Sequence, residues 1–262
     1  MNETVTDVLG LLQVSSPILA SPNHKHARRF FALLDHLRAS KYDRDDPLQL
    51  IAYMVSMAPE SKGQLAQDLW ALWVSGQKTG GYFVEFGAAS GVHLSNSWLL
   101  EKKMGWSGLL AEPNPVFFGS LRQNRSCTIS TRCVYARTGE ELEFVGTRTP
   151  EFSGISDFLA ERDPQKGAAD AERFRVQTIS LNDLLLEAGA PRTIDYLSAD
   201  TEGSEFEILQ AFDFDRWDVR AISVEHNFKA NREKLYDLLT ARGYRRQFTE
   251  LSCFDDWYVK DD

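Results

Sequence analysis

From residue 81 onward, short apolar runs alternate with stretches of helical periodicity, and this alternation restricts the fold more than any other feature of the chain. A buried strand, a helix and a second strand make a βαβ unit, which builds parallel sheets with helices on their faces. The sequence therefore predicts an α/β fold. We expect strands over 82–86, 109–111, 128–134, 194–199 and 221–225, an edge strand over 141–145, a loop over 146–167, and helices over 92–104, 116–124, 181–188, 204–211 and 232–242.

The end of the chain departs from this alternation. Two strand-like runs, 244–248 and 253–259, are separated by only a few residues. A connection this short requires an antiparallel hairpin, because parallel strands need a long crossover. We predict a Rossmann-like, mostly parallel sheet that ends in an antiparallel hairpin, a layout more typical of class I methyltransferases than of dehydrogenases.

Residues 1–78 show no strand pattern and are predicted to form a helical extension before a main domain over 79–262. Three apolar stripes with the spacing of one helix face mark its helices. The stripes are Phe30, Leu33, Leu34 and Leu37; Leu48, Ile51, Ala52 and Val55; and Leu65, Leu69, Leu72 and Trp73. Ser61 and Gln64 predict a capping box for the third helix. A lid, a dimer surface and plain packing are alternative roles for the extension, so a homo-oligomer stays open.

Acidic residues outnumber basic residues, 38 to 29, and give a formal net charge of -9. This charge repels phosphate backbones, so we expect no nucleic-acid partner. The three cysteines lack C-x-x-C spacing, which indicates a reducing compartment rather than disulfides or a zinc site. The sequence shows no leader-like start and no apolar run long enough to span a bilayer. We therefore expect a cytoplasmic protein without a membrane span.

A turn of small residues follows the first predicted strand and indicates a nucleotide site. Small side chains let the backbone approach a ligand closely, and a helix starting after the turn would point free N–H groups at it. Because Glu85 precedes the glycines, it would favour a cation, such as the amino group of S-adenosylmethionine (SAM), over a pyrophosphate. The predicted cofactor-binding residues of this turn are Glu85, Gly87, Ala88, Ala89, Ser90 and Gly91.

The second predicted strand ends at Glu112, 21 residues beyond Gly91. An acidic residue at this distance typically accepts hydrogen bonds from ribose hydroxyls in this architecture. The alternative is a solvated strand end before the following proline turn. We expect the ribose-binding role for Glu112.

Acidic side chains and one histidine gather at the ends of the next two predicted strands. Asp200, Glu202 and Glu205 follow one strand, and Glu225 and His226 end the other. Ligands bind at this carboxyl edge of a parallel sheet. Glu205 is more simply interpreted as complementing the positive end of the helix that follows.

A hydroxyl acceptor must lose a proton during methyl transfer, so the site needs a base. His226 is the first candidate because its imidazole titrates near neutrality, and Asp200, also expected beside the cofactor, is the second. Alternatively, Asp200, Glu202 and Glu225 could hold Mg²⁺, which would lower the pKa of the acceptor without a protein base. His93 is interpreted as a surface or loop-packing residue rather than as a ligand.

Three stretches of the sequence resemble the FkbM-type methyltransferases, a SAM-dependent class I family. They are 84–91, 181–184 and, most specifically, 194–205 with its Asp-x-Glu-Gly-x-Glu pattern. The resemblance covers about residues 81–262 and implies O-methylation of a small molecule such as a sugar, a polyketide or another natural-product or envelope metabolite. Glu85 and Asn182 stand where the family often has aspartate.

Two other function classes use the same features. A nicotinamide-dependent oxidoreductase shares the glycine turn, but the terminal hairpin, Glu85 and the lack of a Tyr-x-x-x-Lys pair count against it. A non-catalytic interaction protein would keep the fold and use the helical extension as its binding surface. The retained turn residues and Glu112 make this second alternative less attractive.

Overall fold

The computed structural model describes residues 32, 34–159 and 172–261. Part of the first predicted helix, including Phe30 and Leu33, lies outside these residues, as does the end of the predicted loop over 146–167. Among the described residues, no helix combines the length and apolar character needed to cross a bilayer.

The main sheet has seven strands in the order β12-β13-β11-β9-β1-β2-β3. Every neighbouring pair is parallel except the two that involve β13, which runs antiparallel to both β11 and β12. This arrangement confirms the predicted Rossmann-like sheet with a C-terminal hairpin. The strands are β1 (Tyr82–Phe86), β2 (Ser107–Ala111), β3 (Thr128–Ser130), β9 (Tyr196–Ala199), β11 (Ala221–Glu225), β12 (Tyr244–Gln247) and β13 (Asp255–Lys260).

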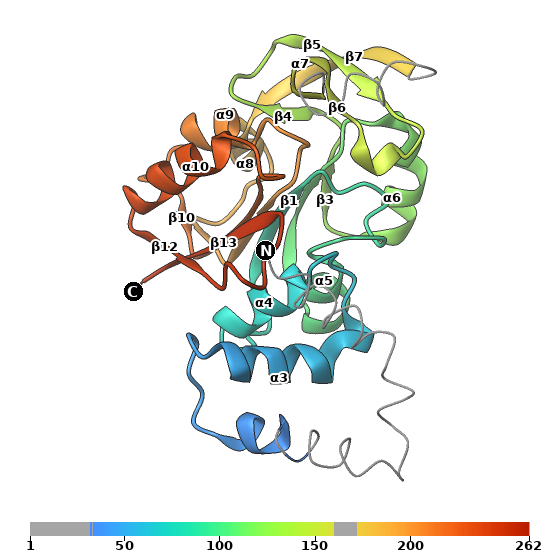
Figure 1. Cartoon of the computed structure of the whole chain (residues 1–262). Coiled ribbons are helices and arrows are strands. Elements are labelled where there is room, and N and C mark those ends of the chain that lie inside the picture. Colours follow the sequence, from blue (N-terminus) through green and yellow to red (C-terminus); the bar gives the residue numbers. More distant parts are fainter. Residues whose placement is uncertain (1–31, 33, 160–171, 262) are drawn as a thin grey trace.

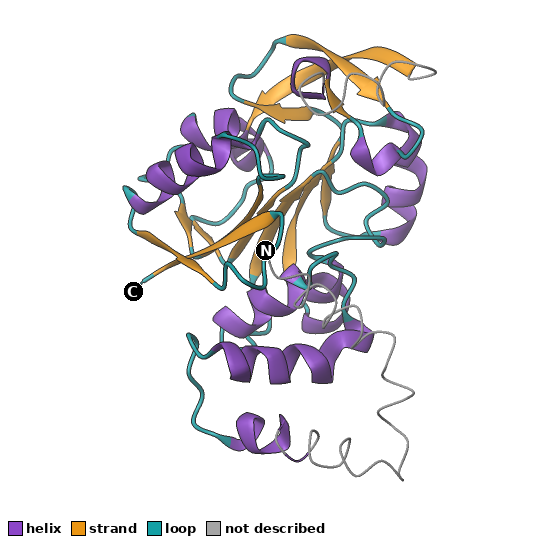
Figure 2. Ribbon diagram, viewed as in Figure 1, coloured by secondary structure: helices purple, strands orange, loops and turns teal. Residues whose placement is uncertain are grey.

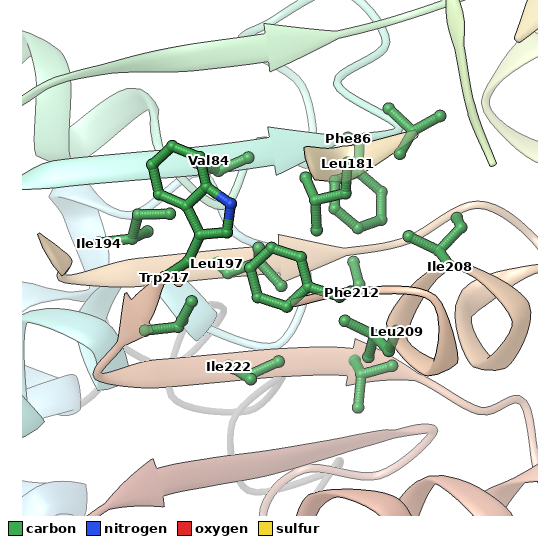
Figure 3. Packing of buried hydrophobic residues seen from close by; sticks show 14 of the residues in the cluster. Val84, Phe86, Leu181, Ile194, Leu197, Ile208, Leu209, Phe212, Trp217 and Ile222 are labelled. Atoms are coloured by element: carbon green, nitrogen blue, oxygen red, sulfur yellow. The ribbon is translucent and has the colours of Figure 1, made fainter. Parts of the chain in front are cut away.

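Helices cover both faces of this sheet because its strands alternate apolar side chains between two cores. In β1, Val84 and Phe86 join one core and Phe83 joins the other. Figure 3 shows the first core, where Leu197 and Ile222 meet helical residues such as Leu209. The helices on that face are α8 (Leu181–Glu187), α9 (Glu205–Gln210) and α10 (Asn231–Thr240); those on the other are α4 (Gln67–Val74), α5 (Trp98–Met104) and α6 (Phe118–Asn124).

The described part of the helical extension packs on the second core. It comprises α3 (Pro47–Met57), the 3₁₀ turn η1 (Ala58–Glu60) and α4. Trp70 of α4 stacks on Trp257 of β13 with ring centroids 5.2 Å apart, so the core is continuous across the boundary expected at residue 78. The predicted stripe of α3 is shifted, since Leu48 is 58% exposed while Leu50 is fully buried.

The predicted capping box of α4 is wrong. Its N-cap is Ala66, which has a left-handed φ of 59° and makes no side-chain cap. The Ser61 hydroxyl instead donates to Oδ1 of Asp68 at 2.6 Å. By contrast, Ser180 does cap α8, by accepting a hydrogen bond from the Asp183 amide.

A second, four-stranded sheet has the order β4-β7-β5-β6 and corrects the prediction for this region. The strand expected over 128–134 is split between the two sheets, and the strand expected at an edge of the main sheet belongs to the second one. β7 was not predicted. Figures 1 and 2 show this sheet at the top of the molecule, opposite α3. Its elements are β4 (Cys133–Tyr135), β5 (Glu141–Gly146), η3 (Pro150–Phe152), β6 (Gly154–Ile155), α7 (Ser156–Leu159) and β7 (Glu172–Ser180).

The first crossover helix is shorter than expected. α5 begins at Trp98 instead of residue 92, so a loop over 87–97 separates it from β1. The remaining described elements are η2 (Pro115–Phe117) and a small pair of parallel strands, β8 (Thr193–Ile194) and β10 (Asp218–Val219).

Candidate active site

Two adjoining hollows lie where β1, β2, β9 and β11 end. Gly87, Ala89, Glu151, Asp200 and Glu202 line both of them. The first hollow, on the β2 side, is also lined by Glu112, Pro113 and residues of the second sheet, including Cys133 and Val134 of β4. The second hollow, with a volume of about 220 Å³, is also lined by Gln64, Ala88, His93, Leu94, Phe152, Glu225, Asn227 and Phe254.

Gly87 is required by the close approach of two loops beneath these hollows. Its φ is +84°, and a Cβ at this position would lie 1.7 Å from the carbonyl oxygen of Asp200. The Asp200 amide in turn donates to the Phe86 carbonyl at 3.2 Å. A side chain at residue 87 would therefore push Asp200 out of place.

The turn after β1 differs from the sequence prediction in how it uses its N–H groups. The amides of Gly87 and Ala88 donate to the Ala111 carbonyl, at 3.0 and 3.3 Å, and the Gly91 amide donates to the Ala88 carbonyl at 2.8 Å. No helix starts here, so the expected helix N-terminus is absent from this described turn. Ser90 and Gly91 lie outside the linings of both hollows.

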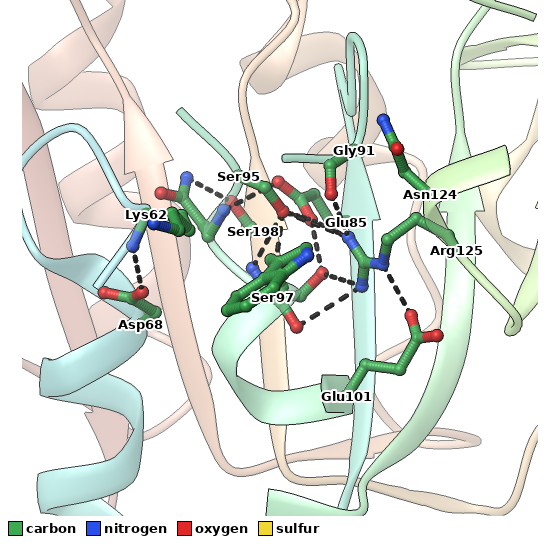
Figure 4. A network of polar contacts seen from close by, with 12 residues as sticks. Lys62, Asp68, Glu85, Gly91, Ser95, Ser97, Glu101, Asn124, Arg125 and Ser198 are labelled. Carbon is green, nitrogen blue, oxygen red and sulfur yellow. Dashed lines mark hydrogen bonds and ion pairs between the residues drawn. The ribbon is translucent and has the colours of Figure 1, made fainter. Parts of the chain in front are cut away.

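Glu85 faces the α4–α6 layer instead of the hollows, because it shares a face of β1 with Phe83. Its Oε1 accepts from the Asn96 amide at 2.8 Å, and its Oε2 accepts from the hydroxyls of Ser95 and Ser97. Nη1 of Arg125 lies 3.8 Å from Oε2 (Figure 4). Burial raises the pKa of Glu85, while Arg125 and the hydrogen bonds oppose the rise. Glu85 thus anchors the loop before α5, and contact with a cofactor in the hollows does not follow from its placement.

Glu112 stands one residue past the end of β2 and faces the first hollow. Its Oε2 accepts from the Ala89 amide at 2.8 Å, and its Oε1 accepts from the Asn114 amide at 2.7 Å. Burial raises the pKa of this carboxyl to about 7. Each oxygen accepts one backbone hydrogen bond and has a second lone pair for a ligand hydroxyl.

Three carboxylates meet in the second hollow. One oxygen from each of Asp200, Glu202 and Glu225 lies within 4.8 Å of the others. Glu205 does not join them, because its Oε1 accepts from the amides of Thr201 and Gly203 and so closes the loop after β9. The three carboxylates that the Mg²⁺ alternative named therefore lie close together, but such an acidic cluster is common without a metal and does not by itself support one.

His226 points away from both hollows. Its Nδ1 accepts from the Phe228 amide at 2.9 Å, and its Nε2 lies 3.8 Å from Oδ1 of Asp256. Burial lowers the pKa of the imidazole to about 4. Glu225 and His226 are successive residues at the end of a strand, so their side chains face opposite sides, and Glu225 takes the side of the hollow. We do not retain His226 as the base.

Sequence reasoning missed several residues of the second hollow. His93 lines it, although we expected a packing role. Gln64 comes from the extension and Phe254 from the residue before β13, and no local motif marks either of them. Asn227 also lines it, and its Nδ2 is buried without a hydrogen-bond partner among the described residues.

The family model of the methyltransferase FkbM domain matches residues 85–246. No curated protein matches the sequence. Among solved structures, precorrin-6y C5,15-methyltransferase from Geobacter metallireducens GS-15 is 16% identical over 75% of this chain and 87% of its own, with a TM-score of 0.38. A METTL16 methyltransferase domain is 14% identical over 99% and 95% with a TM-score of 0.42, and the N-terminal domain of human METTL16 is 13% identical over 99% and 96% with a TM-score of 0.37. These structural overlaps do not bear on what the protein methylates. Because the family model spans more than half of the sequence, the chain belongs to the FkbM methyltransferase family.

Proposed function

We propose that the protein transfers a methyl group from SAM to a hydroxyl of a small molecule, with SAM in the first hollow and the acceptor in the second. The observation that carries this proposal is Glu112, a buried carboxylate that the glycine turn holds through the Ala89 amide at the edge of the first hollow. The two hollows share Asp200, so a methyl group and its acceptor would meet there.

The residues of the first hollow fit SAM chemically. Glu112 would accept hydrogen bonds from the ribose hydroxyls, and the small side chains of Gly87 and Ala89 would let the ligand approach the backbone of the turn closely. The carboxylates shared with the second hollow would favour a positively charged ligand. When bound, SAM supplies an activated methyl group on its sulfonium; the chain has to align it with the acceptor oxygen.

The second hollow suits an acceptor that is uncharged or cationic. Glu151, Asp200, Glu202 and Glu225 contribute carboxylates to its lining. These groups accept hydrogen bonds from hydroxyls and repel phosphates and carboxylates, which supports a small hydroxylated molecule over a nucleic acid. The buried Nδ2 of Asn227 would donate to an acceptor oxygen.

Asp200 is the base in this proposal, because it lines both hollows and is fixed by the contact of its backbone with Gly87. As the acceptor oxygen bonds to the methyl carbon and the carbon–sulfur bond breaks, the hydroxyl proton would pass to the Asp200 carboxylate. A group that takes a proton in this way contributes about 10²–10⁴-fold to a rate. Mg²⁺ has no further support among the described residues.

The first experiment is a thermal-shift comparison of S-adenosylhomocysteine, NADH and NADPH. A ligand at about 100 times its Kd stabilises the folded state by about 2.7 kcal/mol. Only S-adenosylhomocysteine should raise the melting temperature. A shift with NADH or NADPH alone would favour the oxidoreductase, and no shift with any of the three would favour a non-catalytic protein.

A further inference from the structure

The two hollows differ in which parts of the chain line them. Every residue of the first hollow falls between 86 and 204, inside the segment that the FkbM family model matches. The second hollow adds Gln64 and Phe254, which lie before and after that segment. We call these two residues the acceptor wall.

A buried carboxylate holds the loop that carries Gln64. Asp68 accepts hydrogen bonds from the Ser61 hydroxyl at 2.6 Å and from the amides of Lys62 and Gly63 at 2.9 and 3.3 Å. Gly63 also forms a parallel β-bridge with Leu94, another residue of the second hollow. The loop is therefore fixed against the hollow from two sides.

A second buried contact ties this loop to the segment that carries Phe254. The Gln67 side chain accepts from the Leu65 amide at 2.8 Å and donates to Oδ2 of Asp255 at 2.8 Å. The Phe254 carbonyl accepts from the amides of His226 and Asn227 at 2.9 and 3.1 Å. The extension, the hairpin and the end of β11 thus form one connected frame around the second hollow.

We propose that the acceptor wall determines which acceptor binds. The Gln67–Asp255 hydrogen bond is the positioning contact that holds Gln64 and Phe254 in place relative to each other. This inference rests on the proposed function. Gln64 is exposed and offers an amide that donates and accepts, and Phe254 offers a ring. The family segment then supplies the methyl donor site, and the flanking segments supply the specificity.

The test uses two probes that need no known acceptor. S-adenosylhomocysteine occupies only the donor side, whereas a SAM analogue with benzyl in place of methyl also places a ring in the second hollow. Isothermal titration gives the Kd of each probe for wild type, Gln64→Trp and Phe254→Ala. Gln123→Trp is the matched control, because Gln123 is also an exposed glutamine but lies on α6, away from the linings of both hollows.

We expect Gln64→Trp to weaken binding of the benzyl analogue at least about tenfold, and Phe254→Ala to tighten its binding about threefold. The Kd of S-adenosylhomocysteine should change less than about twofold in both variants. Gln67→Ala should change the ratio of the two Kd values, which a loss of stability alone would not do. The inference is overturned if the ratio of the two Kd values in Gln64→Trp, Phe254→Ala and Gln67→Ala equals that of wild type, or if wild type itself does not bind the benzyl analogue. Failure of S-adenosylhomocysteine to bind wild type would instead overturn the proposed function.

Discussion

Two glutamates near the ends of neighbouring strands, Glu85 and Glu112, have different surroundings and different roles. Glu85 lies within β1 and points into the α4–α6 layer, where serine hydroxyls, the Asn96 amide and Arg125 surround it. Glu112 lies just past β2, where two backbone amides donate to its carboxylate and its side chain faces the first hollow. Burial raises the pKa of both. Position relative to the strand end therefore separates a carboxylate that stabilises the fold from one that is available to a ligand.

The largest expected effect is on the Glu85 side of this comparison. The Arg125 side chain is fully buried against Glu85 and donates to Glu101 at 2.5 Å. Removing one partner of a buried ion pair leaves an uncompensated charge and typically costs about 3–5 kcal/mol. Arg125→Met should lower the free energy of unfolding by this amount in urea denaturation.

Arg122→Met, at an exposed arginine of α6, the helix that ends just before Arg125, is the control and should change stability by less than about 0.5 kcal/mol. Equal effects of the two substitutions would show that the Glu85 cluster does not stabilise the fold. S-adenosylhomocysteine affinity, measured where both variants are folded, should stay close to wild type.

The next effect concerns Glu112. Glu112→Gln keeps the shape of the side chain but removes its charge, so a ribose hydroxyl loses a charged acceptor worth about 1.5–3 kcal/mol. At pH 8 we expect the Kd of S-adenosylhomocysteine to rise about 10- to 100-fold, measured where the variant is folded. Glu250→Gln, at an exposed glutamate before β13, should leave the Kd unchanged. An equal Kd for Glu112→Gln and wild type would mean that the ribose is held elsewhere.

The smallest effect is expected at Ser90, which the sequence grouped with the cofactor-binding turn but which lines neither hollow. Its hydroxyl accepts from the His93 amide at 3.2 Å, a contact within the loop. Ser90→Ala should change the Kd of S-adenosylhomocysteine less than about twofold in isothermal titration. A change of tenfold or more would place the ligand over a part of the turn that the hollows do not include.

The central strands of the main sheet could be predicted from the sequence because they are short, mostly apolar and buried runs, as in β1 and β11. The second sheet could not be predicted in this way. The first part of β7 carries exposed charges such as Arg173 and Arg175, and its buried residues lie toward its end. The start of α5 was misplaced because Ser95 and Ser97 bind Glu85 instead of continuing a helix.

Strand ends also decide which candidate residues of the sequence lie at the hollows. Glu112 and Asp200 lie just past strand ends, where a side chain can reach the carboxyl edge of the sheet, and both line the first hollow. Glu85 and His226 line neither hollow, although the sequence placed both at the site. Successive residues of a strand face opposite sides, so an offset of one residue decides which side a side chain faces. Gln64 and Phe254 reach the site through tertiary contacts that no local pattern encodes.

The central claim, that Glu112 binds the cofactor as a carboxylate, is tested most directly by the pH dependence of S-adenosylhomocysteine binding. Its folded pKa of about 7 is above the ordinary value of 4.5, so the charged form that accepts the ribose hydroxyls is lost as the pH falls through 7. The same shift favours the folded state below pH 4.5, and that contribution is lost as the pH rises through 7. Isothermal titration of wild type should show binding about tenfold weaker at pH 6 than at pH 8, with little pH dependence in Glu112→Gln. Equal pH dependence in wild type and variant would contradict the account.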